Sequence, residues 1–499
     1  MKAAECQDNS PEALIEIEEP FPRTLLVSET FRVNLDITNC GSVKWTVAPD
    51  IQSTSGVKIG SFWPRDNRIW GPNRRIIARD LGPSESINVS LVIKAPKVSG
   101  RYRIGWGVVD EHARWVPGSS LLTDIEVTDP AVPELVAICP GQWADRSGHQ
   151  AADDALQECM NQLSEDGVLE IPAGNYLLQN GLEVSNPITI KTSGVELGDP
   201  WTCLENSLNC AVLRAGSSLS SPGGVLNING KSDVTLNHIA IDGNRSFRIA
   251  SEANNFCLQG NNKYGQNIRA NNTLNFKMQW STSSNALCGT ALEMHRAMFA
   301  VIEHNVFSSN GQHSWRQWAD GLTGGNLDGA KIQFNVFRDN SDIDLIFSGK
   351  NSLVARNKIY HSQDSERSFA AIMVDNWRSA EAMDMSGTIL ENNIVNCGQA
   401  RCNYGIQVGP AAWYPTENWV KNFTIRSNQI EGAIVALNIG DASDLLVEGN
   451  KLSWYPSAIK MCGHVPPRFN ITPDRSARLV IRDQVGPDGT LPFSPCPGP

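Results

Sequence analysis

The second half of the chain repeats one pattern in AVIEHNVF (300–307), AKIQFNVF (330–337), SLVARNKI (352–359), TILENNIV (388–395), FTIRSNQI (423–430) and LLVEGNKL (445–452). In each segment an aliphatic run ends in asparagine, and successive asparagines are 22 to 36 residues apart. A strand and turn that recur at such a period predict a solenoid, in which each coil buries its apolar face against its neighbours.

The repeated asparagines have a structural interpretation. They are Asn305, Asn335, Asn357, Asn393, Asn428 and Asn450. An Asn amide can bond both the backbone of its own turn and the next Asn along the stack. We therefore assign all six to the scaffold, and we look for the chemistry on the face where the variable part of each period collects.

Composition excludes some classes of partner. The 499-residue chain carries a net charge of −11, has 19% charged residues and contains no run of Lys or Arg. Nucleic acids and anionic membranes attract basic surfaces, so we expect neither as a partner. No apolar stretch reaches the roughly 18 residues of a membrane span.

The cysteines predict export. There are 12 of them, an even number without a zinc-binding pattern, and Cys203/Cys210, Cys397/Cys402 and Cys462/Cys496 are spaced for disulfides. The opening MKAAECQDNSPEA (1–13) lacks the apolar segment of a signal peptide. We expect a secreted, extracellular protein whose signal peptide is absent from this sequence.

Residues 10–128 form a separate module of short alternating runs divided by turns, which predicts a β-sandwich. The module resembles the tryptophan-rich immunoglobulin-like domain of autophagy cargo receptors and bacterial secreted proteins. The matching residues are Asn39, Gly41, Ser42, Trp45, Pro83, Ala95, Pro96, Gly100, Tyr102, Trp106 and Trp115. The resemblance implies an attachment or spacing role. Residues 129–136, which contain two prolines, are a predicted linker.

Residues 137–499 form the solenoid module. It opens with an amphipathic helix, in which Ala152, Leu156, Met160 and Leu163 share one face, and continues into the strand VLEIPAGNYLL (168–178). This opening resembles the pectate-lyase-like superfamily of right-handed parallel β-helices, whose first helix caps the apolar end of the solenoid. The predicted fold class is therefore all-β, a right-handed parallel β-helix preceded by an immunoglobulin-like β-sandwich.

Alternation in the strands before the Asn-bearing ones predicts a cluster of carboxylates. In DIDLIFSG (342–349), Ile343 and the apolar residues alternating with it are expected inside, which turns Asp342 and Asp344 outward. Asp320 occupies the equivalent stretch one coil earlier. Parallel coils stack about 4.8 Å apart, so the three carboxylates should lie within roughly 5 to 10 Å, the range used in glycoside hydrolysis.

The same residues resemble the motifs of polygalacturonases, dextranases and α-1,3-glucanases built on β-helices. Ala319-Asp320-Gly321 matches their Asp-Gly motif, and NSDID (340–344) stands where their paired aspartates belong. The resemblance implies an inverting glycoside hydrolase in which Asp320, Asp342 and Asp344 share the acid and base roles. The chain has D-x-D in place of DD and lacks the G-H-G and R-I-K motifs of polygalacturonases, which favours a neutral or mixed polysaccharide over galacturonan.

Side chains on the same face are candidates for binding the sugar chain. Outward strand positions, loop tryptophans able to stack on sugar rings, and one nearby cation give this set: Glu293, His295, Trp315, Trp318, Lys350, Asp375, Trp377 and Gln407. Among the histidines near this face, His295, His313 and His361, the pattern favours His295 because it should point outward beside Glu293.

Two alternatives remain open. A polysaccharide lyase would abstract a proton next to a uronate carboxylate, with Arg316, Lys350 or Arg378 as base and Ca²⁺ held by Asp342, Asp344 and Asp375. A non-catalytic carbohydrate-binding surface protein could use the same two modules, because a fold does not determine a function. For the hydrolase we expect no cofactor and no metal, and a polysaccharide or oligosaccharide as partner.

Overall fold

The computed structural model describes residues 6–484. The following segments lie outside the described residues: 7–11, 18–20, 50–52, 54, 63–66, 97–99, 112–113, 129–132, 196–201, 206, 218, 220–223, 251–264, 314–316, 364, 376–382, 411–417, 456–468 and 472–475. The chain divides into two compact units, Met1–Val132 and Pro133–Pro499. Their boundary falls inside the segment expected to be the linker.

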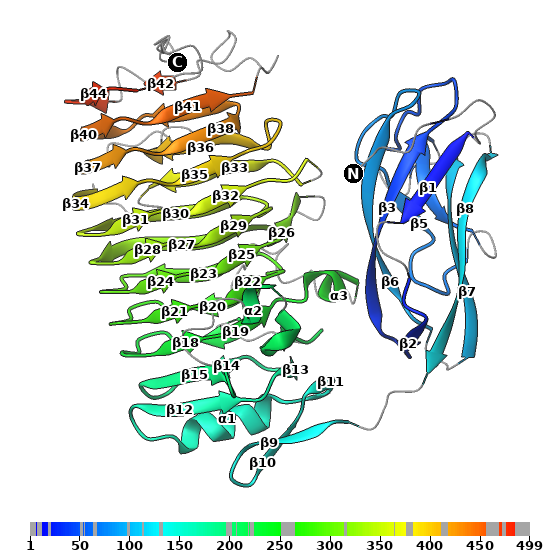
Figure 1. Cartoon of the computed structure of the whole chain (residues 1–499), viewed down its shortest axis with the longest axis horizontal. Helices are drawn as coiled ribbons and strands as arrows, with labels where there is room; N and C mark the ends of the chain where they lie inside the picture. The colour runs from blue at the N-terminus through cyan, green and yellow to red at the C-terminus, as the bar shows by residue number, and fades with distance from the viewer. Residues whose placement is uncertain are drawn as a thin grey trace. The chain divides into compact units, whose positions relative to one another are not determined.

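The first unit is a β-sandwich, as its alternating runs predicted (Figure 1). Its strands are β1 (Ala13–Ile17), β2 (Thr24–Leu26), β3 (Thr30–Asn39), β4 (Val57–Ser61), β5 (Arg74–Ile76), β6 (Ser86–Lys94), β7 (Gly100–Asp110) and β8 (Arg114–Thr128). The strand order is β5-β4-β7-β8-β1-β3-β6, with the long β8 joining the two layers. Trp45 and Trp106 are buried between the layers, so they are core residues.

The second unit is a parallel β-helix of three long sheets (Figure 1). Parallel crossovers are right-handed in nearly all proteins, in line with the predicted right-handed solenoid. Sheet I consists of β11 (Ser147–Ala151), β13 (Gly174–Leu178), β16 (Ala211–Ala215), β19 (Ile239–Asp242), β22 (Thr282–Ser284), β25 (Val306–Ser308), β29 (Val336–Arg338), β32 (Lys358–Tyr360), β35 (Ile394–Asn396), β38 (Gln429–Ala433) and β41 (Lys451–Trp454).

Sheet II consists of β12 (Gly167–Ile171), β15 (Ile188–Thr192), β18 (Thr235–Asn237), β21 (Lys277–Gln279), β24 (Val301–Glu303), β28 (Lys331–Gln333), β31 (Leu353–Ala355), β34 (Met383–Glu391), β37 (Val420–Arg426), β40 (Ala442–Glu448), β43 (Ser476–Ala477) and β44 (Val480–Arg482). Sheet III consists of β14 (Leu182–Glu183), β17 (Leu226–Asn227), β20 (Ile268–Arg269), β23 (Gly289–His295), β27 (Gln317–Asp328), β30 (Ile343–Lys350), β33 (Ser368–Val374), β36 (Cys402–Val408), β39 (Val435–Ile439) and β42 (Phe469–Ile471), and β26 (Gly311–Gln312) pairs with β27. Each coil passes through sheets III, II and I in that order.

The N-terminal end of the β-helix is covered by short elements. These are the hairpin β9 (Leu135–Cys139) and β10 (Gln142–Asp145) and the helix α1 (Asp153–Gln162). Leu156 and Met160 of α1 are fully buried in the core of the solenoid, as the helical pattern predicted. The remaining helices are α2 (Thr202–Glu205), η1 (Ser207–Asn209) and α3 (Arg245–Ala250). None of the helices in the described residues is long and apolar enough to cross a membrane.

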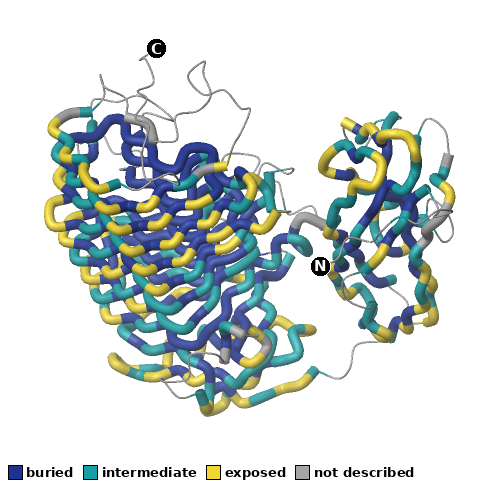
Figure 2. The backbone as a smooth tube through the Cα atoms, turned by 45° about the horizontal axis from the view of Figure 1, so that its top comes forward, coloured by how far each residue is buried: buried dark blue, intermediate teal, exposed yellow. Residues whose placement is uncertain are grey.

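The asparagine ladder forms at the turns between sheets II and I. Asn335, for example, donates its side-chain amide to Asn357 Oδ1 at 3.1 Å and to the Ile302 carbonyl at 2.8 Å. The same pattern links all six ladder asparagines, each of which is buried. Figure 2 shows the buried interior, in dark blue, that continues through successive coils.

Disulfides bind segments of both units. The predicted pairs Cys203–Cys210 and Cys397–Cys402 are confirmed, and two more, Cys6–Cys40 and Cys139–Cys159, are present. The predicted pair Cys462/Cys496 lies outside the described residues. Disulfides of this number are typical of proteins that fold in an oxidising compartment.

Candidate active site

Asp320 belongs to β27, and Asp342 directly precedes β30. These strands lie on adjacent coils of sheet III (Figure 1), and the two carboxyl groups are close enough to affect each other's ionisation. The Asp342 backbone N–H donates to the Ala319 carbonyl at 3.3 Å, and the Ile343 N–H donates to Asp320 Oδ1 at 3.1 Å. The spacing of 22 residues thus corresponds to one coil, and the two carboxyl groups are close neighbours.

Asp320 is held by two donors. In addition to the Ile343 N–H, the Thr323 hydroxyl donates to its Oδ2 at 2.7 Å. Both bonds favour the ionised form, but burial and the nearby Asp342 carboxylate outweigh them and raise the pKa of Asp320 well above its usual range. The protonated form of Asp320 is therefore favoured relative to that of an ordinary aspartate.

Asp342 lies in a different environment. Burial raises its pKa to about 6, while His313 nearby opposes that shift. His313 donates from Nε2 to the Ser341 carbonyl, and its backbone N–H donates to a Glu366 carboxylate oxygen. Because a carbonyl oxygen only accepts hydrogen bonds, this contact places a proton on Nε2. His313 thereby helps to fix the segment that carries Asp342.

Trp318, on β27 two residues before Asp320, lies at the edge of the site. Its ring meets His313 edge to face, with centroids 6.2 Å apart, and 53% of the residue is exposed. An exposed indole beside carboxyl groups offers a flat apolar surface for a sugar ring. The other tryptophans expected here, Trp315 and Trp377, lie outside the described residues.

The outward orientation predicted for Asp344 is wrong. Asp344 is completely buried, and it accepts hydrogen bonds from Asn340 Nδ2 at 2.8 Å and from His361 Nε2 at 2.7 Å. Burial disfavours the charged form of His361, but Asp344 outweighs it, so that the pKa of His361 is raised.

The error in the orientation of Asp344 arises at the start of β30. Ile343 packs with Ile346 and Met373 in a small cluster apart from the main core, while Leu345 belongs to the core. These residues at positions i and i+2 pack in different clusters, so simple alternation does not hold between 343 and 345. Asp344 instead ends a second asparagine ladder, because Asn310 Nδ2 donates to Asn340 Oδ1 at 2.7 Å.

Glu293 lies one coil before Asp320. It pairs in register with Thr323, and its carboxylate accepts hydrogen bonds from Asn271 at 2.6 Å, from Gln266 and from Arg269 at 3.3 Å. His295 follows on the same strand, with its backbone N–H bonded to Asn271 Oδ1 at 2.7 Å. Burial lowers the pKa of His295. A polar strip therefore adjoins the aspartate pair.

Three other candidates lie away from the aspartate pair. Gln407 is buried and is bonded to the Gly409 carbonyl and to Asn438, both at 2.7 Å, so it joins neighbouring coils. Asp375 is buried beyond the end of β33. Lys350 is at the far end of β30, about 23 Å from Ile343 at ~3.3 Å per residue, and pairs with Asp328. The structure does not bring these residues to the aspartates.

Some residues of the site were missed or ranked low. Thr323 and Glu366 were not predicted, and His313 and His361 ranked below His295. His313 and Glu366 stand in loops, where no periodicity indicates orientation. In the part of the chain that the structure describes, no group of three or more His, Cys, Asp or Glu side chains could hold a metal ion. Arg316 and Arg378, the other bases considered for a lyase, lie outside it.

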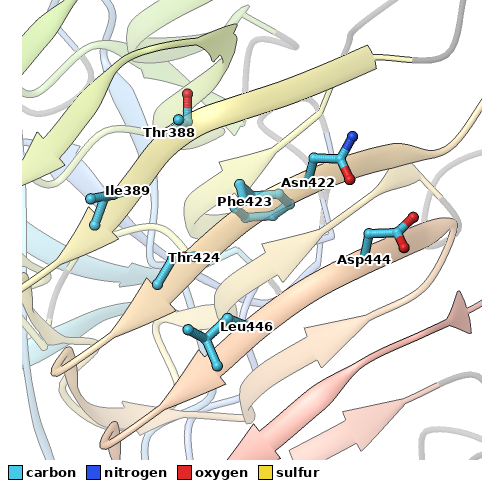
Figure 3. Close-up of a pocket in the computed structure, with 8 residues that line it drawn as sticks. Thr388, Ile389, Asn422, Phe423, Thr424, Asp444 and Leu446 are labelled. Atoms are coloured by element: carbon cyan, nitrogen blue, oxygen red, sulfur yellow. The ribbon is translucent and has the colours of Figure 1, made fainter.

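A shallow depression of about 310 Å³ lies elsewhere, on sheet II (Figure 3). Ile389, Thr424 and Leu446 form part of its lining, and Asn422 and Asp444 stand at one side. The hydrogen bond from Arg478 lowers the pKa of Asp444 to about 2. A carboxylate that is ionised and already paired is unsuited to proton transfer at neutral pH, so we place the chemistry on sheet III.

Comparison with known proteins agrees with the first unit as an immunoglobulin-like domain. Residues 21–127 match the family model of the Ig-like domain from next to BRCA1 gene. No curated protein is detectably similar in sequence. Among solved structures, the mannuronan C-5 epimerase A-module of Azotobacter vinelandii is similar at 12% identity, over 70% of this chain and 87% of that chain, with a TM-score of 0.47.

Two further structures are similar to the chain. One is the endo-xylogalacturonan hydrolase of Aspergillus tubingensis, at 13% identity over 70% of this chain and 93% of that chain, with a TM-score of 0.47. The other is the catalytic domain of an α-1,3-glucanase, at 12% identity over 98% of both chains, with a TM-score of 0.39.

Proposed function

We propose that the β-helix unit is an inverting glycoside hydrolase that cleaves polysaccharides at Asp320 and Asp342. The supporting observation is this pair of carboxyl groups on adjacent coils, both buried enough that their pKa values are raised. Paired carboxyl groups with elevated pKa values suit acid–base catalysis near neutral pH.

The two aspartates take different roles. Burial and the neighbouring Asp342 carboxylate raise the pKa of Asp320, so we assign it to protonate the glycosidic oxygen as the bond from that oxygen to the anomeric carbon breaks. Asp342 is ionised above its pKa of about 6 and takes a proton from water, whose oxygen bonds to the anomeric carbon on the opposite face. A retaining enzyme would instead use one carboxylate as a nucleophile on the anomeric carbon, and the anomeric configuration of the product distinguishes the two mechanisms.

A panel of neutral and acidic polysaccharides tests this function. We expect new reducing ends without the ultraviolet absorbance of an unsaturated sugar, and a product whose anomeric configuration is inverted in proton NMR. Products carrying a double bond would identify a lyase. Binding without cleavage of any glycan in the panel would identify a non-catalytic carbohydrate-binding protein.

The pH profile follows from the two carboxyl groups. We expect kcat/KM to fall below about pH 6, where Asp342 becomes protonated and can no longer accept the proton of water. It should fall again at higher pH, where Asp320 loses the proton it must donate. Rates measured over the range in which circular dichroism shows folded protein would test this. A rate that is constant through pH 6 would contradict the assignment of Asp342 as base.

The disulfides support an extracellular site of action, where polysaccharide substrates occur. The N-terminal sandwich has a tryptophan-lined core and fits the attachment or spacing role expected from its sequence.

A further inference from the structure

We propose that the enzyme attacks its glycan from one chain end, because the site is open toward the N-terminal coils and closed toward the C-terminal coils. This inference rests on the proposed function. It concerns one column of side chains on sheet III, formed by residues that pair in register from coil to coil, which passes beside Asp320. Successive coils contribute Glu183, Asn227, Arg269, Glu293, Thr323, Ile346, Met373, Gln407 and Asn438 to this column.

The N-terminal part of the column is polar and increasingly exposed. Thr323 is 3% exposed beside Asp320, Glu293 is 9% exposed one coil earlier, and Arg269 before it is half-buried. Asn227 is half-buried, and Glu183 is exposed. Solvent access thus grows with each coil away from the carboxyl groups in this direction.

The C-terminal part of the column is closed. Ile346 and Met373, the next two members, are 2% and 0% exposed, and Gln407 and Asn438 after them are 0% and 6% exposed. A glycan that passes Asp342 therefore finds no exposed side chain of this column on which to continue.

The open and closed parts of the column meet beside Asp342. Phe369 occupies the next coil, where its backbone N–H donates to the Asp342 carbonyl at 2.7 Å. Its ring packs on Tyr404 with centroids 5.3 Å apart, beside the buried Ile343 and Met373. This apolar cluster forms a wall behind the aspartate pair, and we expect a terminal sugar to rest against it.

The N-terminal part of the column, from Glu183 to Thr323, is called the open strip. It has the chemistry to bind sugar hydroxyl groups. Glu293 is held by Asn271, Gln266 and Arg269, and its ion pair with Arg269 leaves no excess charge there. The Oε1 atom of Gln266 is buried without a hydrogen-bond partner. A buried acceptor without a partner is rare in native proteins, and a hydroxyl donor of the substrate would satisfy it.

The products of the wild-type protein test the direction of attack. On the polysaccharide that it cleaves, we expect one short product from the first turnovers and little early loss of viscosity. Chemical capping of the chain end that is attacked should abolish release. A broad range of early products, or cleavage of substrate capped at both ends, would overturn the inference while leaving the hydrolase intact. Absence of any cleavage would remove the proposed function and this inference with it.

Two matched variants test which side binds the rest of the chain. Glu293→Gln should raise KM about 10-fold for long oligosaccharides and by a smaller factor for the shortest substrate, because a longer chain makes more of its contacts on this strip. Glu303→Gln makes the same change on sheet II of the same coil, where Glu303 bonds Gln333, and should alter neither KM. An equal effect of Glu293→Gln on short and long substrates would overturn the placement of the chain on this strip.

Discussion

Asp320→Asn and Asp342→Asn should each lower kcat by about 10²-fold or more on the cleaved glycan, the scale of losing positioned acid or base assistance. An amide of nearly the same shape can neither protonate the leaving oxygen nor accept a proton from water. The single-turnover rate with saturating substrate measures the loss, because product release then has no influence.

The same substitutions should not destabilise the fold. Both carboxyl groups have a higher pKa in the folded protein than in the unfolded chain, so folding favours their protonated forms. Their stabilising effect is present at low pH and is lost as pH rises through the folded pKa. At neutral pH, ionising these carboxyl groups in their buried positions costs free energy. A neutral amide removes that cost, so the apparent melting temperature at neutral pH should stay the same or rise.

Asp328→Asn is the matched control. Asp328 stands on the same strand, β27, but at the opposite end, where it is bonded to Asn351 and paired with Lys350. Its activity should stay within about two-fold of wild type, as for a substitution at a solvent-accessible ion pair. Turnover close to wild type in both Asp320→Asn and Asp342→Asn would show that this pair is not the catalytic centre.

The scaffold was predictable from sequence because every coil repeats the same physical requirement. The ladder asparagines from Asn305 to Asn428 each bond the next one, and this imposes a periodic signal on the sequence. Asp320 was identifiable because it sits one coil from Asp342, and a parallel stack converts that separation into proximity.

Prediction failed where no regular alternation or repeat reports the position of a side chain. Asp344 lies in β30, but simple alternation does not hold between Ile343 and Leu345, and its partner His361 comes from the turn after β32. His313 and Glu366 contact one another across 53 residues from two loops, which no local pattern encodes. The disulfide Cys139–Cys159 joins β9 to α1, so its pairing depends on how the helix docks at the end of the solenoid.

Asn357→Ala should lower the free energy of unfolding of the β-helix unit by about 3 kcal/mol or more, a large effect for a single substitution. Asn357 is fully buried in the middle of the ladder. Its Oδ1 accepts from the backbone N–H of Asn335 at 3.0 Å and from the Asn335 amide at 3.1 Å, and its Nδ2 donates to the Ile332 carbonyl at 2.9 Å.

Alanine cannot replace any of these bonds. The backbone N–H of Asn335 would lose its acceptor in a place that water does not reach, and such a stranded donor costs about 1–3 kcal/mol by itself. The Ile332 carbonyl and the Asn335 amide would each lose one contact as well. Because a solenoid is stabilised by interfaces between neighbouring coils, the weakened interface affects the coils on both sides.

Urea unfolding followed by circular dichroism would measure this effect, with Asn396→Ala as the control. Asn396 is exposed on sheet I in the coil that follows, and its Oδ1 accepts one bond from the Gly398 N–H at 2.9 Å. Water can replace that bond, so the control should lose less than about 1 kcal/mol. Equal transitions for Asn357→Ala and Asn396→Ala would mean that the ladder contributes little to stability. The repeated asparagines would then have to be explained by their turn conformation alone.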